Sequence, residues 1–174
     1  MPVRRLNHAV LFVRDVERSV EFYREVLGFA PIDGMASLRG AAFLRAPAST
    51  NDHDLGLFEI GAEAGPSGAG RSTVGLYHLA WEVETLADLA EVAQKLSERG
   101  ALAGATDHAT TKALYGKDPD GIEFEVMWLI PKDLLTPEIL GQRDKLAPLD
   151  LPGEIERFGA DTLGGIGISV PAPA

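Results

Sequence analysis

Residues 6–13 read LNHAVLFV, and residues 76–83 read LYHLAWEV. Each stretch is a short apolar run of the kind that forms a strand, and each carries a histidine at its third position, His8 or His78. The same leucine and histidine recur at the same places about seventy residues apart. This recurrence indicates an internal repeat.

An amphipathic helix is predicted directly after each run. In the first half, Asp15 can cap a helix whose apolar residues recur at helical spacing until Gly28. In the second half, the same spacing begins at Leu86 and ends at Gly100. Further strand-like runs follow the helices at 36–45, 54–60, 101–107, 111–116 and 122–130. The sequence therefore predicts an α+β fold built from two tandem βαβββ modules.

Composition marks the border between the modules. Residues 61–73 read GAEAGPSGAGRST and are too poor in apolar side chains to form core, so they are the predicted linker. We expect a single domain over 1–130, with module 1 at about 4–62 and module 2 at about 74–130.

The chain beyond Pro131 is rich in proline and glycine. Residues 131–174 are therefore predicted to form an extended C-terminal tail, in which a short helix is allowed at 136–146. We expect the tail to wrap its own domain or a neighbouring subunit, and we expect the protein to be a homo-oligomer.

The composition excludes several classes of partner and chemistry. The 174 residues include 16 Lys and Arg against 26 Asp and Glu, and the net charge of −10 would repel nucleic acid and anionic lipid. Because the chain has no cysteine, a metal would have to be held by histidine and carboxylate. The first apolar run contains His8 and stops at Arg14, so it is predicted to be a strand and not a signal peptide. No apolar segment is long enough to span a bilayer, and we expect a cytoplasmic protein.

His8 and His78 occupy equivalent positions in the two predicted modules. Side chains two residues apart share one face of a strand, so His8 is predicted to lie with Val10 and Phe12. A lone histidine in such a place is more often a partly buried core residue bonded to a carbonyl, and this alternative stays open for each taken alone. If a pseudo-twofold axis relates the modules, the two imidazoles converge.

A tight turn precedes the last predicted strand. Residues 118–121 read DPDG, which is typical of a β-turn, and Glu123 and Glu125 then share one face of the strand. Taken alone, the two glutamates are better explained as an exposed strand face. Beside His8 and His78, one of them would complete a site of two histidines and one carboxylate, which leaves one face of an octahedral metal open.

The order of these residues resembles the vicinal oxygen chelate superfamily, and within it the type I extradiol ring-cleavage dioxygenases. The signature of that family is a histidine in T-x-H, an apolar residue with tyrosine, an acidic residue with Pro-x-Gly, and a glutamate shortly after. Here the signature runs from Thr106-Asp-His108 through Leu114-Tyr115 and the DPDG turn to Glu125. HDLGLF at 53–58 and LYHLAWEVET at 76–85 are similar to two further strands of the family, so the resemblance covers about 6–130.

The resemblance implies a metal site. Glu125 would be the carboxylate ligand, with His8 and His78 as the other two ligands, and Glu123 would be solvated or paired. Two neutral imidazoles and one carboxylate would leave Fe(II), or Mn(II), with a net positive charge that a catecholate can neutralise while one position stays free for O2. The implied partners are therefore a small-molecule catechol and O2.

The resemblance also implies three catalytic residues. His53 would be the acid–base, because the unperturbed pKa of histidine lies near neutrality. His108 and Tyr115 would donate hydrogen bonds to the substrate oxygens and stabilise the charge that develops there. Without the resemblance, His53 would be interpreted as an exposed loop histidine and Tyr115 as an ordinary strand aromatic.

Two alternatives come from other branches of the same superfamily. In a glyoxalase-like site, Glu59 would be the first-module counterpart of Glu125 and a fourth ligand to Ni²⁺ or Zn²⁺. Such a ligand would remove a position that catechol and O2 together require. The other alternative is a metal-free binding protein like the bleomycin-resistance proteins, which leaves the ligand set without a purpose. We favour the dioxygenase over both alternatives.

Overall fold

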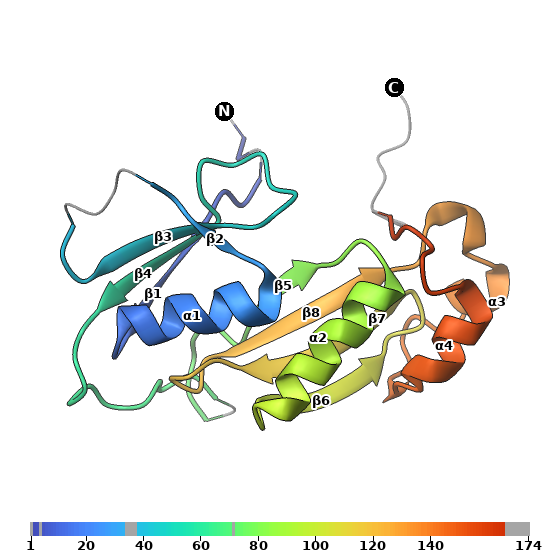
Figure 1. Ribbon diagram of the computed structural model, residues 1–174. Coiled ribbons are helices and arrows are strands. Elements are labelled where there is room, and N and C mark those ends of the chain that lie inside the picture. The colour runs from blue at the N-terminus through green and yellow to red at the C-terminus, as the bar shows by residue number, and fades with distance from the viewer. Residues whose placement is uncertain (1, 4, 34–37, 71, 166–174) are drawn as a thin grey trace. The chain divides into compact units, whose positions relative to one another are not determined.

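The computed structural model of the protein describes residues 2–3, 5–33, 38–70 and 72–165. The chain forms two compact units. Unit 1 takes residues 1–68 and 118–122, and unit 2 takes residues 69–117 and 123–174. Each unit has a sheet and a long helix of its own (Figure 1).

The sheet of unit 1 has four strands in the order β1-β4-β3-β2. Their bounds are Ala9–Val13 for β1, Leu55–Glu59 for β4, Ala41–Arg45 for β3 and Ala30–Pro31 for β2. β1 runs parallel to β4, and the other neighbours are antiparallel. A parallel first strand needs a crossover connection, and α1 (Val16–Leu27) supplies the helix in that connection.

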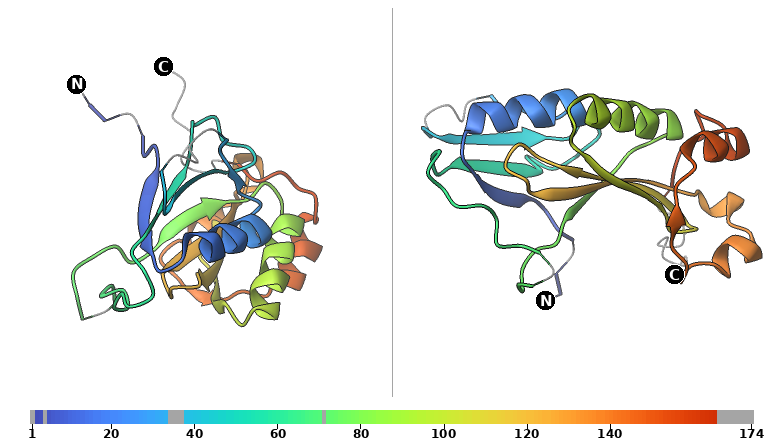
Figure 2. Two further views of the ribbon diagram at one scale, coloured as in Figure 1. Left: turned by 60° about the vertical axis from the view of Figure 1, so that its left-hand side comes forward. Right: turned by 90° about the horizontal axis from the view of Figure 1, so that it is seen from below.

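The helix α1 covers one face of this sheet (Figure 2). It begins where the side chain of Asp15 accepts a hydrogen bond from Arg18 N at 3.0 Å, and it ends at Gly28, whose φ of 71° favours glycine. Leu11 and Val13 of β1 are buried, whereas the alternate residues of the strand are exposed. The core of unit 1 therefore lies between α1 and one face of the sheet.

The turn at 118–122 belongs to unit 1. Gly121 N donates to Asp118 O at 2.9 Å and Gly121 has a φ of 82°, so the predicted DPDG turn is confirmed. The Asp118 carboxylate accepts from Ile122 N at 2.8 Å and from the Tyr23 hydroxyl of α1 at 3.2 Å. Burial, and after it the charge of Asp118, raises the pKa of Tyr23 well above its ordinary value.

The sheet of unit 2 has five strands in the order β5-β8-β7-β6-β9. Their bounds are Leu79–Glu82 for β5, Glu123–Leu129 for β8, Thr111–Lys117 for β7, Leu102–Asp107 for β6 and Ala147–Pro148 for β9. β5 and β8 are parallel and the remaining pairs are antiparallel, as in unit 1. Both units thus repeat the same arrangement of a parallel first strand and an antiparallel remainder.

The helix α2 (Leu86–Glu98) packs on the sheet of unit 2 (Figure 2). A capping box starts it, since Thr85 accepts from Asp88 N and the Asp88 side chain accepts from Thr85 N. The fit against the sheet is close at Gly116, where an added Cβ would lie 2.6 Å from Phe124 and 3.1 Å from Leu96. Only glycine therefore fits at this position without a shift of its neighbours.

The residues after β8 are not extended throughout, and this corrects the predicted tail. They form a 3-10 turn at Lys132–Leu134, α3 (Pro137–Leu140), strand β9 and α4 (Leu151–Phe158). The predicted helix at 136–146 is limited to α3, and α4 was not predicted. α4 packs beside α2, and Trp128 Nε1 donates to Thr162 O at 3.2 Å just beyond it. Residues 166–174 of the predicted tail lie outside the described residues.

The predicted α+β class and the two βαβββ modules are confirmed. The first strand of each module is shorter than predicted, because pairing begins only at Ala9 with Leu55 and at Leu79 with Phe124. The two-residue β2 was not predicted, and residues 36 and 37 of the predicted strand 36–45 lie outside the described residues. None of the helices in the described ranges has the length and apolar character that crossing a bilayer requires.

Candidate metal centre and acid–base site

His78 and Glu125 face each other in unit 2. His78 immediately precedes β5, and Glu125 lies in β8 with Ala80 as its partner in the parallel register. His78 Nε2 lies 3.1 Å from Glu125 Oε2, and only 9% of the Glu125 side chain is exposed. Glu125 is therefore a buried carboxylate beside an imidazole and not part of an exposed strand face, whereas Glu123 is half-buried at the start of β8.

Tyr115 and His108 extend this pair. Tyr115 lies in β7 directly opposite Glu125, and its hydroxyl donates to Glu125 Oε1 at 3.4 Å. His108 follows β6, and its Nε2 lies 2.9 Å from the same hydroxyl. Because a phenol has one proton, a tyrosine that donates to Glu125 accepts from His108 Nε2. His108, Tyr115, Glu125 and His78 thus form one continuous polar chain.

The environment of Tyr115 keeps its hydroxyl protonated. Burial, followed by the negative charge and the hydrogen bond of Glu125, raises the pKa of Tyr115 to about 12. A phenol with this pKa is a hydrogen-bond donor throughout the neutral range.

His8 and His53 lie together in unit 1. Their ring centroids are 4.4 Å apart, and the ring of Phe43 packs edge-on against His53 at 5.1 Å. His8 Nδ1 lies 2.8 Å from Asn7 Oδ1, and His53 Nδ1 lies 2.9 Å from Asp52 Oδ2. A side-chain oxygen beside each Nδ1 fixes the tautomer with the proton on Nδ1, so each Nε2 carries the lone pair. The His53 side chain is 17% exposed, so the exposed-loop alternative is wrong.

The loop that carries His53 is held by a carboxylate that the sequence analysis missed. Asp54 is buried and accepts from Ala46 N at 2.8 Å, from Ser49 Oγ at 2.7 Å and from Asn51 Nδ2 at 2.7 Å. Burial alone would raise the pKa of Asp54, but these hydrogen bonds and the adjacent His53 lower it below its ordinary value. The signal was present in the Ser, Asn and Asp of residues 49–54, which form side-chain-to-backbone turns.

Asn51 connects this loop to the segment that carries His8. Its Nδ2 donates to Asn7 O at 2.8 Å as well as to Asp54, and its Oδ1 accepts from the Arg5 guanidinium. Asn7 directly precedes His8, so this amide joins the backbone beside one histidine to the loop of the other. A backbone hydrogen bond from Ala9 N to Asp54 O at 3.0 Å joins the same two segments.

The strand register corrects the prediction for Glu59. Val10 lies two residues after His8 and pairs with Gly56, just as Ala80 lies two residues after His78 and pairs with Glu125. The counterpart of Glu125 is therefore Gly56, which has no side chain to offer a metal. Glu59 is exposed at the end of β4, where its Oε2 accepts from Val16 N at 3.1 Å in the first turn of α1. The glyoxalase-like fourth ligand is thus excluded by position.

The structure groups the six predicted site residues by unit. His78, Glu125, Tyr115 and His108 meet in unit 2, and His8 and His53 meet in unit 1. Across the ranges that the structure describes, no set of three or more His, Asp or Glu side chains is arranged as a complete metal site.

Comparison with known proteins identifies a family over the part of the chain that carries the predicted site residues. The family model described as the Glyoxalase/Bleomycin resistance protein/Dioxygenase superfamily matches residues 5–126. The chain belongs to this superfamily. The match covers both modules from just before His8 to just after Glu125 and ends before the tail. The predicted superfamily is therefore confirmed, and the two-sheet α+β structure agrees with the vicinal oxygen chelate fold.

Two curated members of the superfamily are similar in sequence. The Catechol-2,3-dioxygenase of Bacillus subtilis is 34% identical over 127 residues, which are 70% of this chain and 40% of that protein. The Biphenyl-2,3-diol 1,2-dioxygenase 3 of Rhodococcus globerulus is 30% identical over 123 residues, which are 67% of this chain and 59% of that protein. The chain thus spans less than two thirds of either relative.

A solved structure supports the assignment of the fold. The glyoxylase/bleomycin resistance protein/dioxygenase domain from a Frankia strain superposes with a TM-score of 0.59 at 25% sequence identity. The superposition covers 72% of this chain and 92% of that domain. The part of this chain outside the superposition is comparable in length to the C-terminal extension.

Proposed function

We propose that this protein is an extradiol dioxygenase, an oxidoreductase that cleaves the ring of a catechol with O2 at an Fe(II) site. The observation that carries the proposal is the buried contact between His78 Nε2 and Glu125 Oε2, continued by Tyr115 and His108. The names of the two relatives, both of ring-diol dioxygenases, support the same reaction.

The proposed ligands are His8, His78 and Glu125, and the donor atoms fit a divalent metal. Two ligands at about 2.0–2.2 Å from one ion and at right angles to each other lie about 3 Å apart. The 3.1 Å between His78 Nε2 and Glu125 Oε2 agrees with that separation. On His8, the Asn7 oxygen beside Nδ1 leaves Nε2 as the donor, in the manner of an outer partner that orients a ligand.

Two histidines and one carboxylate form the ligand set of non-haem Fe(II) oxygenases, and Mn(II) suits the same donors. Bound there, Fe(II) would supply the redox chemistry that joins O2 to the catechol ring. Three protein ligands leave room for both reactants, and the glycine at position 56 adds no fourth ligand.

His53 is the proposed acid–base. Its Nδ1 proton is held by Asp52, so the lone pair of Nε2 is available to take a proton from a catechol hydroxyl and later return it to the product. Phe43 packs against the ring and limits its rotation. The catalytic nitrogen is thereby oriented from two sides.

Tyr115 and His108 are the proposed donors to substrate oxygens. Because the pKa of Tyr115 is raised to about 12, its hydroxyl stays protonated and can redirect its hydrogen bond from Glu125 to a substrate oxygen. His108 Nε2, which lies 2.9 Å from the tyrosine oxygen, would likewise redirect its hydrogen bond to a substrate oxygen.

Metal content and ring cleavage together test the proposal. Purified protein should hold iron or manganese in a one-to-one ratio and convert catechol to a product with ring-fission absorbance. His8→Ala, His78→Ala and Glu125→Gln should each lose metal and activity, whereas Glu59→Gln should keep both, since Glu59 lies out of register with Glu125. A metal-free wild type with no turnover would refute the function, and retention of iron and turnover by any of the three ligand variants would refute the ligand set.

A further inference from the structure

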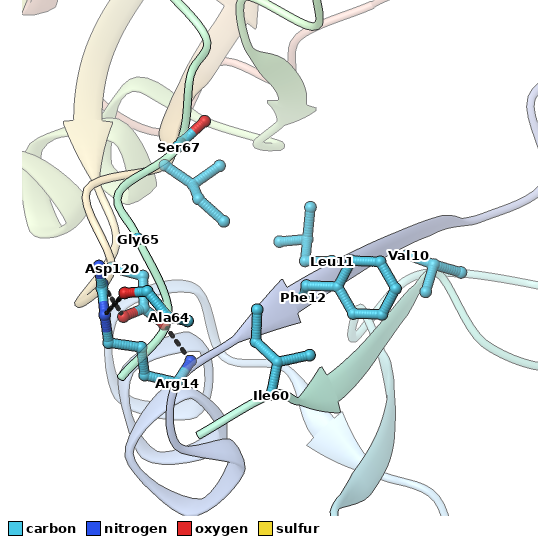
Figure 3. Close-up of a pocket in the computed structure, with 10 residues that line it drawn as sticks. Val10, Leu11, Phe12, Arg14, Ile60, Ala64, Gly65, Ser67 and Asp120 are labelled. Carbon is cyan, nitrogen blue, oxygen red and sulfur yellow. Dashed lines mark hydrogen bonds and ion pairs between the residues drawn. The ribbon is translucent and has the colours of Figure 1, made fainter. Parts of the chain in front are cut away.

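Ion pairs join distant segments of the chain in both units. In unit 1, Arg14 Nη1 lies 2.7 Å from Asp120 Oδ1 at the edge of a cavity, and Arg14 N donates to Asp120 Oδ2 at 2.9 Å (Figure 3). This pair fixes the turn at 118–122 to the end of β1. In unit 2, Lys112 is paired with Asp107, the residue directly before His108, so this ion pair adjoins the proposed site.

The ammonium of Lys112 is enclosed by two carboxylates. Only 1% of the Lys112 side chain is exposed, and its Nζ lies 2.6 Å from Asp107 Oδ1 and 3.0 Å from Glu154 Oε2. A lysine is almost never buried without such partners, because a charge taken out of water has to be compensated. Asp107 ends β6 and Glu154 lies in the first turn of α4. The ammonium therefore joins the sheet of unit 2 to the C-terminal extension.

Asp107 also holds the loop between β6 and β7. The oxygen that pairs with Lys112 accepts a hydrogen bond from Ala109 N at 2.7 Å. Ala109 has a φ of 62°, and among the described residues it is the one non-glycine residue in the left-handed region. Such a conformation persists only where neighbouring contacts hold it. The carboxylate of Asp107 thus fixes the residue that directly follows His108.

The same loop sets the direction of the His108 ring. The His108 N donates to Thr111 O at 2.9 Å, and the His108 carbonyl accepts from Thr110 N at 2.8 Å. At the other end of the side chain, Nε2 lies 2.9 Å from the Tyr115 hydroxyl. Because both ends are fixed, a change in the backbone of residues 107–111 would move Nε2 relative to Tyr115.

We propose that the C-terminal extension positions His108 through three residues, Glu154, Lys112 and Asp107, which together form the extension clamp. They are positioning residues, which act on the loop and not on the substrate. The inference rests on the proposed function, in which His108 donates to a substrate oxygen. The family match ends at residue 126, so Glu154 comes from a part of the chain outside it. Removal of the Glu154 charge would weaken the hold of α4 on Lys112, and with it the position of Asp107.

A double-mutant cycle on turnover tests the extension clamp. Glu154→Gln keeps the size of the side chain and should lower kcat for catechol about tenfold, a part of the roughly 10²–10³-fold that the loss of a donor to developing charge costs, with little change in KM. In a His108→Gln background, the same substitution should leave kcat unchanged, because its effect passes through His108. The matched control is Glu156→Gln, at an exposed position of the same helix, which should keep wild-type kcat.

Amide hydrogen exchange followed by NMR gives a readout that needs neither metal nor turnover. The amide of Ala109, which donates to Asp107, should exchange about tenfold faster in Glu154→Gln than in the wild type. Val92→Ala shortens a buried side chain of α2 and controls for a general loss of stability. It should lower the denaturation midpoint without this change at Ala109.

The outcomes separate the extension clamp from the reaction. If catechols are cleaved, wild-type kcat in Glu154→Gln or additive effects in the cycle refute the clamp and leave the dioxygenase standing. If protein loaded with Fe(II) cleaves no catechol, the proposed function fails, and a faster exchange at Ala109 in Glu154→Gln still supports the clamp. An unchanged exchange rate at Ala109 refutes the clamp in either case.

Discussion

Asp54→Asn should destabilise the protein, although it only replaces one carboxylate oxygen by an NH2 group. The Asp54 carboxylate accepts three hydrogen bonds, from Ala46 N, Ser49 Oγ and Asn51 Nδ2, at 2.7 to 2.8 Å. An asparagine can keep the bonds to its oxygen, but its NH2 group would face a donor. Hydrogen bonds to a charged group contribute about 1.5–3 kcal/mol each, so the loss of one bond plus a donor–donor contact predicts about 2–4 kcal/mol.

The dependence of this effect on pH has a definite sign. The pKa of Asp54 is lowered in the folded protein, because the hydrogen bonds from Ala46, Ser49 and Asn51 outweigh the opposing effect of burial. Its contribution to stability is therefore fully present above the ordinary pKa of 3.8 and is lost as the pH falls through the folded value. The difference between wild type and variant should be constant from pH 5 to 8 and shrink in more acidic solution.

Urea denaturation followed by circular dichroism measures the effect. Asp52→Asn is the matched control. The Asp52 side chain is 80% exposed and contacts His53, and it is not part of the hydrogen-bond network around Asp54. The control should cost less than about 0.5 kcal/mol while altering the pH profile of kcat through His53. Equal stability of the two variants at neutral pH would show that the network around Asp54 does not hold the His53 loop.

Three further results are expected. His53→Phe should keep iron and catechol binding but slow the chemical step by about 10²–10⁴-fold, and near wild-type kcat at saturating O2 would contradict the acid–base role. Lys112→Met should cost about 3–5 kcal/mol in urea denaturation, because it removes the buried ammonium that lies 2.6 Å from Asp107 and 3.0 Å from Glu154 and neutralises both carboxylates. Gly116→Ala should cost about 1–3 kcal/mol through its contact with Phe124, whereas Gly104→Ala, with its nearest neighbour at 3.9 Å, should be nearly neutral by the same assay.

The repeat of a histidine-bearing run and a capped helix was sufficient to predict the modules. Asp15 and Gly28 bound α1 as expected, because local capping chemistry decides where a helix begins and ends. β2 could not be predicted, since two residues carry no periodicity and form a strand only by pairing with β3. The helix α4 was not predicted because its sequence contains a proline and a glycine, which disfavour helix. It packs beside α2, and its stability depends on that contact.

For the site, the sequence motif predicted which residues take part, whereas strand register and contacts between distant residues could not be predicted. The T-x-H to Glu125 signature predicted which side chains carry the chemistry, and in unit 2 these side chains meet. The alternative that made Glu59 the counterpart of Glu125 was wrong because position along the sequence does not give the register between strands, and only the pairing of Val10 with Gly56 shows the offset. Asn51 and Asp54 were missed because their partners, such as Asn7 and Ala46, are specified by the fold.

The most direct test of the proposed function is ring cleavage of catechol by protein that has first been loaded with Fe(II) under anaerobic conditions. The reaction is then started with ¹⁸O2. Mass spectrometry of the ring-opened product should show both oxygen atoms of O2 incorporated, with one O2 consumed per catechol. The same preparation of Glu125→Gln, which removes the buried carboxylate beside His78, should give no labelled product. Absence of labelled product from the iron-loaded and manganese-loaded wild type would contradict the assignment as an extradiol dioxygenase.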